Sequence, residues 1–431
     1  MERWISFLGL STMLALAWLC SDNRRKMNVR LIVSGVALQL LLAVVLLKSP
    51  AGEAAFRGAR TFVLGLIRCS DEGAKFVFGS SFYAPEFTST YGTPFFVSVL
   101  STVVFFSTLT AVLFHLGVLQ WLVKAMARVM VWVMDTSGAE SLCASANVFI
   151  GMTTAPLVIR PYLQTMTRSE LMAMMTGGMA TVAGGTMAAY ANMGADPGHL
   201  MVASLLSAPA SLVVAKMMVP ETESSPTKGT VKIAVPKQDA NILDAACRGA
   251  GEGLKLSLNI AAMLIAFIAL VYLLNWGLAG LSHLVDWGLS FAAHQGDAPP
   301  TLRQFLGGRE LSLQLLLGWA FAPVAWIMGV EPKDAQAVGM LLGEKTIFNE
   351  FVAYQHLSTA EVRSAISPRS FVIATYALCG FANFGSIAVM IGGIGGLVPT
   401  RRSDFAKYGF RSLIGGTLAA FMTACIAGML I

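Results

Sequence analysis

The chain has 431 residues, of which 55% are hydrophobic and only 13% are charged, and its mean hydropathy is +0.67. Soluble domains carry about a quarter charged residues, so this composition excludes an ordinary soluble protein and indicates a polytopic membrane protein embedded in lipid. The net charge of +6 is modest and lies in loops, so we expect a positive-inside bias and no nucleic-acid partner.

Long apolar runs predict membrane-spanning helices along the whole chain. They lie near residues 3–20, 29–48, 92–118, 170–192, 198–219, 255–285, 369–397 and 405–430. A bilayer core needs about twenty apolar residues per helix, so we expect an all-α membrane protein with about eight transmembrane helices in one bundle. No small-residue cleavage site follows the first run before Arg24, so we expect this helix to be retained.

Other segments are apolar but interrupted, and they predict helices that do not simply cross the membrane. Residues 52–80 and 119–136 carry charged side chains between Phe, Leu and Trp at helical spacing, which indicates interfacial helices. Residues 310–357 are broken by charges and glycines, and residues 138–163 form an earlier polar interruption. Both segments favour a re-entrant hairpin over ordinary spans.

The basic linker 220–250, which we expect in the cytoplasm, separates two halves that resemble each other. Each half contains a polar hairpin followed by a Gly-rich helix, at residues 180–186 in the first half and 380–386 in the second. This arrangement predicts two inverted repeats with opposed hairpins and a binding site between them. The glycines alone are also compatible with close helix packing.

The strongest candidate for a functional residue is Glu350, in the second hairpin. A carboxylate at bilayer depth is costly and is retained for a task such as binding a polar solute, an ion or a proton. It can accept hydrogen bonds from neighbouring sugar hydroxyls, and Asn349 is placed to brace the turn. The alternatives are a carboxylate paired with Lys345 or one that lies at the membrane surface.

Asn383 and Ser386 follow in the Gly-rich helix of the second half. Their spacing of three predicts that they share one helix face and offer an amide and a hydroxyl to a common cavity. Phe381 is near enough in sequence to stack on a ring of the solute. A hydrogen bond from Asn383 to another helix is the alternative.

The first half offers oxygen ligands for a small cation. Asn147 precedes the hairpin tip, and its side-chain carbonyl joins the Thr181 hydroxyl in this interpretation. Backbone carbonyls near Ile150 and Val182 would complete an oxygen cage, because unwound backbone at a helix break often coordinates sodium. An ordinary polar cap would explain Asn147 taken alone.

No pattern in the sequence predicts catalysis. The five histidines are dispersed, and no HExxH, Walker-type or GxSxG motif occurs. We therefore expect neither an enzyme nor a bound cofactor, and an integral membrane enzyme is the less favoured class.

Several stretches together resemble the concentrative nucleoside transporter family, of the bacterial sodium-coupled type. They occur in order over nearly the whole chain, at residues 138–142, 146–151, 155–162, 207–210, 220–223, 349–354 and 379–383. Such an ordered set is highly specific for one family. The resemblance implies sodium-coupled uptake of nucleosides by an elevator-like shift, in a homotrimer of the inner (plasma) membrane.

The resemblance also implies a division of labour along the chain. Scaffold helices would occupy residues 1–118 and 251–309, on either side of the first transport repeat, 119–219, and the linker, 220–250. The second transport repeat would occupy residues 310–431.

Individual roles follow from the matched positions. Glu350, Asn383 and Ser386 would hold the ribose, with Asn349 beside them, and Phe381 would flank the base. The sodium positions correspond to Asn147, Ile150, Thr181 and Val182, and the presence of Asn147 favours sodium over a proton.

The chain departs from the family at the tip of the first hairpin, which would read the base. The family usually has Gly-Gln-Thr-Glu there, whereas this chain has Gly151, Met152, Thr153 and Thr154. Loss of one hydrogen bond in a buried site reduces the binding free energy by on the order of 1–3 kcal/mol. We therefore expect the sugar to be recognised as in the family and the preference among bases to differ. Uptake of another hydroxyl-rich solute, or a non-transporting sensor with the same fold, are the alternatives.

Overall fold

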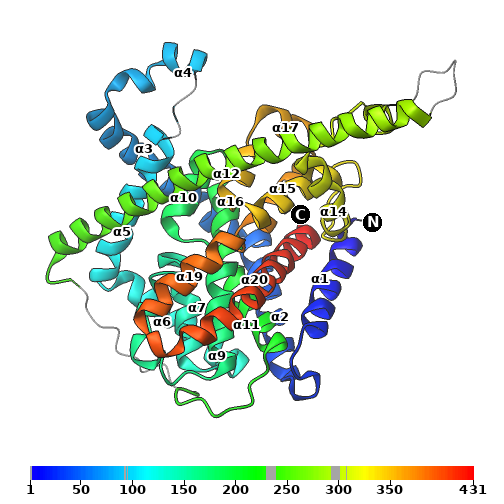
Figure 1. Ribbon diagram of the computed structural model, residues 1–431. Helices are drawn as coiled ribbons and strands as arrows, with labels where there is room; N and C mark the ends of the chain where they lie inside the picture. The colour runs from blue at the N-terminus through cyan, green and yellow to red at the C-terminus, as the bar shows by residue number, and fades with distance from the viewer. Residues whose placement is uncertain (1, 92–93, 95, 230–238, 293–300, 307) are drawn as a thin grey trace.

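The computed structural model describes residues 2–91, 94, 96–229, 239–292, 301–306 and 308–431. Within these ranges the chain is helical, and one isolated antiparallel bridge joins Ser137 to Lys228. The two ends of the chain meet, since Arg3 Nη2 donates a hydrogen bond to the carbonyl of Ile431 at 3.0 Å. The first and last helices accordingly lie side by side (Figure 1).

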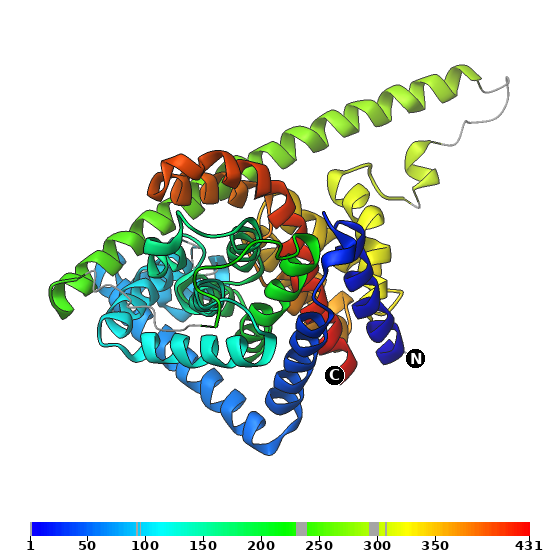
Figure 2. The ribbon, with the colours of Figure 1, turned by 90° about the horizontal axis from the view of Figure 1, so that it is seen from below.

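The N-terminal helices form one side of the molecule. They are α1 (Glu2–Leu19), α2 (Val29–Lys48), α3 (Pro50–Phe78), α4 (Pro85–Tyr91) and α5 (Ser101–His115). Short 3₁₀ turns lie at Arg24–Lys26 and Ser80–Tyr83, and a π-helical segment, Phe96–Leu100, leads directly into α5. A sharp corner separates α2 from α3, because Ser49 caps α3 by accepting from the Gly52 amide and Pro50 occupies its first turn (Figure 2). The expected helices 3–20, 29–48 and 52–80 are therefore present, while part of the start of 92–118 lies outside the described residues.

Two sets of helices follow the same order in the two halves. The first set is α6 (Val118–Met134), α7 (Gly138–Ile150), α8 (Ala155–Val158), a turn at Arg160–Tyr162, α9 (Arg168–Ala180), α10 (Gly184–Asn192) and α11 (Pro197–Met218). The second set is α14 (Leu313–Ile327), α15 (Ala335–Ile347), α16 (Glu350–Leu357), α17 (Ala360–Ala365), α18 (Pro368–Leu378), α19 (Phe384–Leu397), a turn at Pro399–Arg401 and α20 (Arg402–Leu430). Each set contains a leading helix, a hairpin, a broken helix and a long helix, and the hairpin followed by the Gly-rich helix is the part that the repeat pattern predicted. The leading helix α14 lies within residues 310–357, which were expected to form the hairpin alone.

Two expected helices, 170–192 and 369–397, are each divided in two. The first breaks between α9 and α10 and the second between α18 and α19. Hydropathy cannot detect such breaks, because the residues that unwind remain apolar and only their backbone conformation changes. Five helices in the described part of the chain are long and apolar enough to cross a membrane, namely Val29–Lys48, Phe96–His115, Pro197–Met218, Ile242–Trp287 and Pro399–Leu430.

A long helix, α12 (Ile242–Ala292, 51 residues), joins the two halves, and the short α13 (Leu302–Phe305) follows it. The apolar run predicted only residues 255–285. The helix starts earlier, in a charged segment. There the Arg248 guanidinium forms ion pairs with the Asp239 carboxylate (Nε–Oδ1, 2.6 Å) and the Glu252 carboxylate (Nη1–Oε1, 2.9 Å), so these charged side chains are paired. The end of the expected linker 220–250 is therefore helical, and its residues 230–238 lie outside the described residues.

Burial separates a core from a periphery. The most apolar windows of α11 and α20 are 89% and 78% buried, whereas those of α2 and α12 are only 28% and 22% buried. Figure 1 shows α12 running across the outside of the bundle, while α11 and α20 pass through its middle. Central helices therefore pack against protein on all sides, and peripheral ones expose apolar faces of the kind that lipid covers.

Candidate functional site

The tip of the first hairpin is a tight turn that only glycine can begin. Gly151 has φ +78°, and a Cβ there would lie 2.7 Å from the Cβ of Ala183, in the break between α9 and α10. The tip residues 152–154 follow as a turn, and α8 then begins with Pro156 in its first turn. The first hairpin tip is thus placed directly on the broken helix of its own repeat.

The tip of the second hairpin is shorter and is closed by side-chain capping. Asn349 accepts a hydrogen bond from the Val352 amide at 3.0 Å and caps α16, which starts with Glu350. The expected bracing of the turn by Asn349 corresponds to this cap. Glu350 thereby stands at a helix N-terminus, where the helix dipole favours a negative charge.

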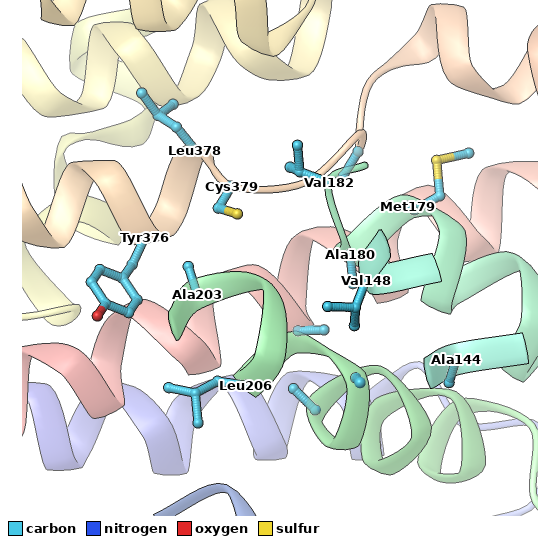
Figure 3. Close-up of a cluster of buried hydrophobic side chains, with 14 of the residues drawn as sticks. Ala144, Val148, Met179, Ala180, Val182, Ala203, Leu206, Tyr376, Leu378 and Cys379 are labelled. Atoms are coloured by element: carbon cyan, nitrogen blue, oxygen red, sulfur yellow. The ribbon is translucent and has the colours of Figure 1, made fainter. Parts of the chain in front are cut away.

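The two broken helices touch at their breaks. A Cβ on Gly380 would lie 2.9 Å from the carbonyl oxygens of Met179 and Ala180, and Gly380 has φ +136°. Figure 3 shows Val182 from one break beside Cys379 from the other, above a layer of buried side chains from α11. Only a residue without a side chain permits this approach, so the backbones of the two breaks lie in close contact.

Asn383 and Ser386 are brought together, but not as two residues of a regular helix face. Asn383 is the N-cap of α19, with extended backbone, and its Oδ1 accepts from the Ser386 amide at 2.8 Å. The expected shared helix face is therefore replaced by a cap and the first turn that it closes. Both residues nevertheless line the same cavity, as the sequence predicted.

Glu350 is 2% exposed and accepts two hydrogen bonds. Its Oε1 accepts from the Tyr190 hydroxyl at 3.0 Å, and its Oε2 accepts from Asn383 Nδ2 at 2.8 Å. The alternative of an ion pair with Lys345 is wrong, because the Lys345 ammonium donates to the Ala377 carbonyl at 2.8 Å instead. The alternative of a carboxylate at the surface is excluded by burial.

Tyr190 is the partner that the sequence did not reveal. It lies on α10 of the first repeat, is fully buried, and stacks on Tyr354 with ring centroids 4.3 Å apart. Its contact with the carboxylate joins the two repeats across 160 positions of the chain. The available signal was a lone tyrosine among small residues in the Gly-rich helix, which by itself does not identify a partner.

A cavity of about 550 Å³ lies between the two hairpin tips. The predicted residues Met152, Thr153, Thr154, Asn349, Glu350, Phe381, Asn383 and Ser386 all line it. Helix α12 adds a polar edge that the sequence did not predict, with Arg248, Glu252, Lys255 and Asn259. The cavity therefore lies where both repeats meet the long helix, and its lining combines apolar side chains with a few convergent polar groups.

The first hairpin tip contributes neutral groups to this cavity. A Cβ on Gly178 of α9 would lie 2.9 Å from Met152 Cβ and 3.4 Å from the methyl carbon of Met390. Met152 therefore packs its backbone and Cβ closely against α9, next to a buried methionine of α19. The hydroxyls of Thr153 and Thr154 are the side-chain polar groups of this tip.

The predicted cation ligands lie around the first break. Asn147 is 1% exposed, and its Oδ1 has no hydrogen-bond partner among the described residues. The same side chain faces Gly177, whose carbonyl accepts from the Thr181 hydroxyl at 2.8 Å. Ile150 is the last residue of α7. The Val182 carbonyl accepts a hydrogen bond from the Ser204 hydroxyl at 3.3 Å. The Thr181 hydroxyl oxygen, which donates to Gly177, keeps its lone pairs for a ligand.

A buried acceptor without a donor is costly, by about 1–3 kcal/mol, and a native structure keeps one where an ion or water completes it. The donor set here consists of amide, hydroxyl and backbone oxygens, which suits a hard cation of low charge. The polar-cap alternative does not account for Asn147, because the free Oδ1 caps no amide.

Comparisons with known proteins agree over the entire chain. Residues 8–81 match the model "Na+ dependent nucleoside transporter N-terminus", residues 199–428 match the corresponding C-terminus, and residues 96–197 match a "Nucleoside recognition" gate. An uncharacterized transporter of Haemophilus influenzae is 40% identical over 99% of this chain and 97% of its own length. Sodium/nucleoside cotransporter 1 of Rattus norvegicus is 37% identical over 100% of this chain, which spans 64% of that relative.

Solved structures show the same fold. CNTnw in an inward-facing substrate-bound state superposes with a TM-score of 0.88 at 36% identity, over 100% of this chain and 98% of that one. Variants of CNTnw in outward-facing and intermediate states superpose with a TM-score of 0.89 at the same identity.

Proposed function

Because the chain belongs to the Na⁺-dependent nucleoside transporter family, a family of multi-pass membrane transporters and not of enzymes, we propose that it couples nucleoside uptake to sodium entry. One observation carries the proposal. A buried carboxylate, Glu350, is held by Tyr190 and Asn383 at the edge of a cavity between two hairpin tips. A site of this kind binds a hydroxyl-rich solute away from water.

The second hairpin and the second break hold the ribose in this proposal. Each carboxylate oxygen of Glu350 accepts one protein hydrogen bond and keeps a further lone pair for a substrate hydroxyl. Ser386 and Asn383 add a hydroxyl and an amide, and Asn349 fixes the turn that presents them. Phe381, which lines the same cavity, flanks the base.

The first hairpin tip faces the base. Thr153 and Thr154 can exchange hydrogen bonds with a base edge, whereas Met152 offers a polarizable apolar contact. The residues proposed to bind the ribose all lie in the second hairpin and the second break. The altered tip of the first hairpin therefore changes the preference among bases and does not affect sugar recognition. Bases with fewer polar groups or modified bases are the substrates that this lining favours.

Sodium is the coupling ion in this proposal, and Asn147, Ile150, Thr181 and Val182 are its ligands. The unpartnered Asn147 Oδ1 supports this assignment. Sodium bound there would hold α7 against the first break, and through Gly151 and Ala183 it would fix the tip that closes on the base. Ion and nucleoside thereby stabilise one another's sites.

We further propose an elevator-like movement of the two repeats, 119–219 and 310–431, against a scaffold made of 1–118 and 251–309, with 220–250 as a cytoplasmic connection. The cavity lies between both hairpins and α12, so a shift of the repeats along α12 would carry the site. Capture of the related CNTnw in inward-facing, intermediate and outward-facing states supports this movement. We also propose a homotrimer in the inner (plasma) membrane, to be tested by the mass of the purified protein in detergent.

The deciding experiment is uptake of radiolabelled pyrimidine and purine nucleosides into proteoliposomes, with and without an inward sodium gradient. We expect uptake of at least one nucleoside that requires the gradient. Accumulation of a different hydroxyl-rich solute would identify the second transporter alternative. Substrate binding without counterflow would identify a sensor and contradict the proposed transport.

A further inference from the structure

One buried carboxylate of the second hairpin has no part in the site described above. Glu344 lies in the last turn of α15 and is fully buried. Its Oε1 and Oε2 lie 3.0 and 2.8 Å from Nδ1 of His356, which lies in the last turn of α16. The contact therefore joins the two arms of the hairpin whose tip carries Asn349 and Glu350.

The partner of Glu344 differs in kind from the partners of the other buried carboxylates in the described part of the chain. Each of those is met by a donor that keeps its proton near neutral pH. They are Glu140 with Lys216, Glu170 with the Thr167 amide, Asp239 with Arg248, Asp334 with the Ser367 amide, and Glu350 with Tyr190 and Asn383. An imidazole, in contrast, gains and loses its proton between about pH 5 and 8. The charge balance of Glu344 therefore depends on pH.

The other ionisable side chains around His356 have partners of their own or face outward. They lie on α16 itself and on the helices packed against it, α10, α15, α17 and α18. They are Glu350, which is bonded to Tyr190; Tyr354, which donates to the Thr375 carbonyl; Lys345, which donates to the Ala377 carbonyl; Arg363, which lies over the Phe371 ring; Arg369, which donates to the Gly428 and Ile431 carbonyls; Tyr376, which contacts His199; and Glu361, which is exposed. Among the described residues, Glu344 is thus the charged group that His356 faces.

We propose that Glu344 and His356 form a proton-binding site, and that the bound proton stabilises the contact between the two arms of the second hairpin. With the proton bound, an imidazolium faces the carboxylate and the buried negative charge is paired. The side chain of His356 is 40% exposed and lies one turn from the end of the hairpin, so its proton can leave for water. The carboxylate then stays buried beside a neutral ring, which is unfavourable for an ionised group.

This site would regulate the protein whichever solute occupies the cavity. Glu350 is the first residue of α16 and His356 lies at the other end of the same helix. A weaker contact between the arms would therefore disturb the position of the Glu350 carboxylate. Binding of the proton and binding of the solute should support one another, so uptake should fall as the pH rises through the titration of His356.

The first test needs no solute. The melting temperature of the wild-type protein in detergent should fall as the pH rises from about 6 to about 9, because the pair loses its proton in this range. His356→Lys supplies a cation that stays protonated, and Glu344→Gln removes the buried charge. Each should show a melting temperature that changes less with pH than that of the wild type. His283→Gln, which removes an exposed histidine on α12, is the matched control and should follow the wild type.

The second test measures sodium-driven uptake into proteoliposomes with equal pH on both sides. Wild-type uptake should fall at least about tenfold between about pH 6 and 9, because an unpaired buried charge costs that much or more. His356→Lys should keep its activity at the higher pH. His356→Gln should be low at both pH values, because a neutral side chain faces the carboxylate throughout. A wild type that takes up no nucleoside would contradict the proposed function, and the melting temperatures would then decide on the proton site.

The results distinguish a proton site from a packing contact. Melting temperatures of the wild type and His356→Lys that fall in parallel with pH would show that the histidine acts by its shape, and would overturn the proposal. If His356→Lys does not fold, the same comparison with Glu344→Gln decides. If neither variant folds, the wild type decides alone, since a melting temperature that is constant over this pH range also overturns the proposal.

Discussion

The two hairpins compare most clearly at their tips. In the first repeat, Gly151 turns the chain and the tip carries Met152, Thr153 and Thr154, all neutral. In the second repeat, capping by Asn349 closes the turn and places Glu350 at the start of α16. The same hairpin frame therefore presents apolar and hydroxyl groups from one side of the cavity and a carboxylate from the other.

The two breaks differ in a related way. Ala183, the N-cap of α10, provides no side-chain cap at the first break. Asn383 is the N-cap of α19: its Oδ1 accepts from the Ser386 amide, and its Nδ2 donates to the Glu350 carboxylate. The two breaks thus have a similar backbone course but different side-chain capping, and the proposed function assigns an ion to the first and a sugar to the second. Four changes would test or sharpen this contrast.

Loss of the carboxylate should have the largest effect. Glu350→Gln keeps the shape of the side chain but removes the charge that strengthens two substrate hydrogen bonds, each worth about 1.5–3 kcal/mol. We expect sodium-driven uptake to fall by a hundredfold or more, on the order of complete loss. The exposed Glu361→Gln on α17 is the control. Normal uptake by Glu350→Gln would refute the role of this residue in binding hydroxyls.

Restoring the family's tip should have the next largest effect, and in the opposite direction. Met152→Gln with Thr154→Glu returns an amide and a carboxylate to the first tip. We expect affinity for at least one nucleoside to rise by roughly tenfold to a hundredfold, from about 1–3 kcal/mol of added hydrogen bonding. Calorimetric titration with a panel of nucleosides measures it. Unchanged affinities throughout the panel would show that another part of the cavity compensates for the tip.

Removal of the unpartnered Asn147 oxygen should weaken sodium binding and leave the residues that bind the sugar unchanged. Asn147→Ala should raise the sodium concentration for half-maximal uptake by about tenfold, because one ligand worth about 1–2 kcal/mol is lost. Ser145→Ala, on the same buried helix with its hydroxyl bonded to Ser141, is the control. A sodium dependence equal to that of the wild type would rule out Asn147 as a ligand.

The contact between the repeats should have the smallest effect of the four. Tyr190→Phe removes one hydrogen bond to Glu350 but keeps the stacked ring and the bond from Asn383. We expect nucleoside affinity to fall by up to about tenfold with sodium binding unchanged. Tyr354→Phe, whose hydroxyl bonds to the Thr375 carbonyl, controls for loss of a buried hydroxyl. An equal fall in nucleoside affinity in Tyr190→Phe and Tyr354→Phe would show that the bond from Tyr190 to Glu350 has no specific role in binding.

The sequence by itself was sufficient for the membrane class, the positions of most helices and the existence of two repeats. These features depend on local composition, because lipid demands long apolar helices and the polar interruptions stand out against them. It also pointed to Glu350 and Asn147, since polar side chains in apolar segments are costly and few.

Only the tertiary structure decided which of these polar groups meet. The close approach of the two breaks and the hydrogen bonds from Tyr190 and Asn383 to Glu350 all join segments that are far apart in the sequence. No local pattern encodes such pairings, because a hydrogen bond between repeats is selected by packing across the crossing and not by neighbours in the chain. For the same reason, only the fold could show that the Lys345 ammonium donates to the carbonyl of Ala377.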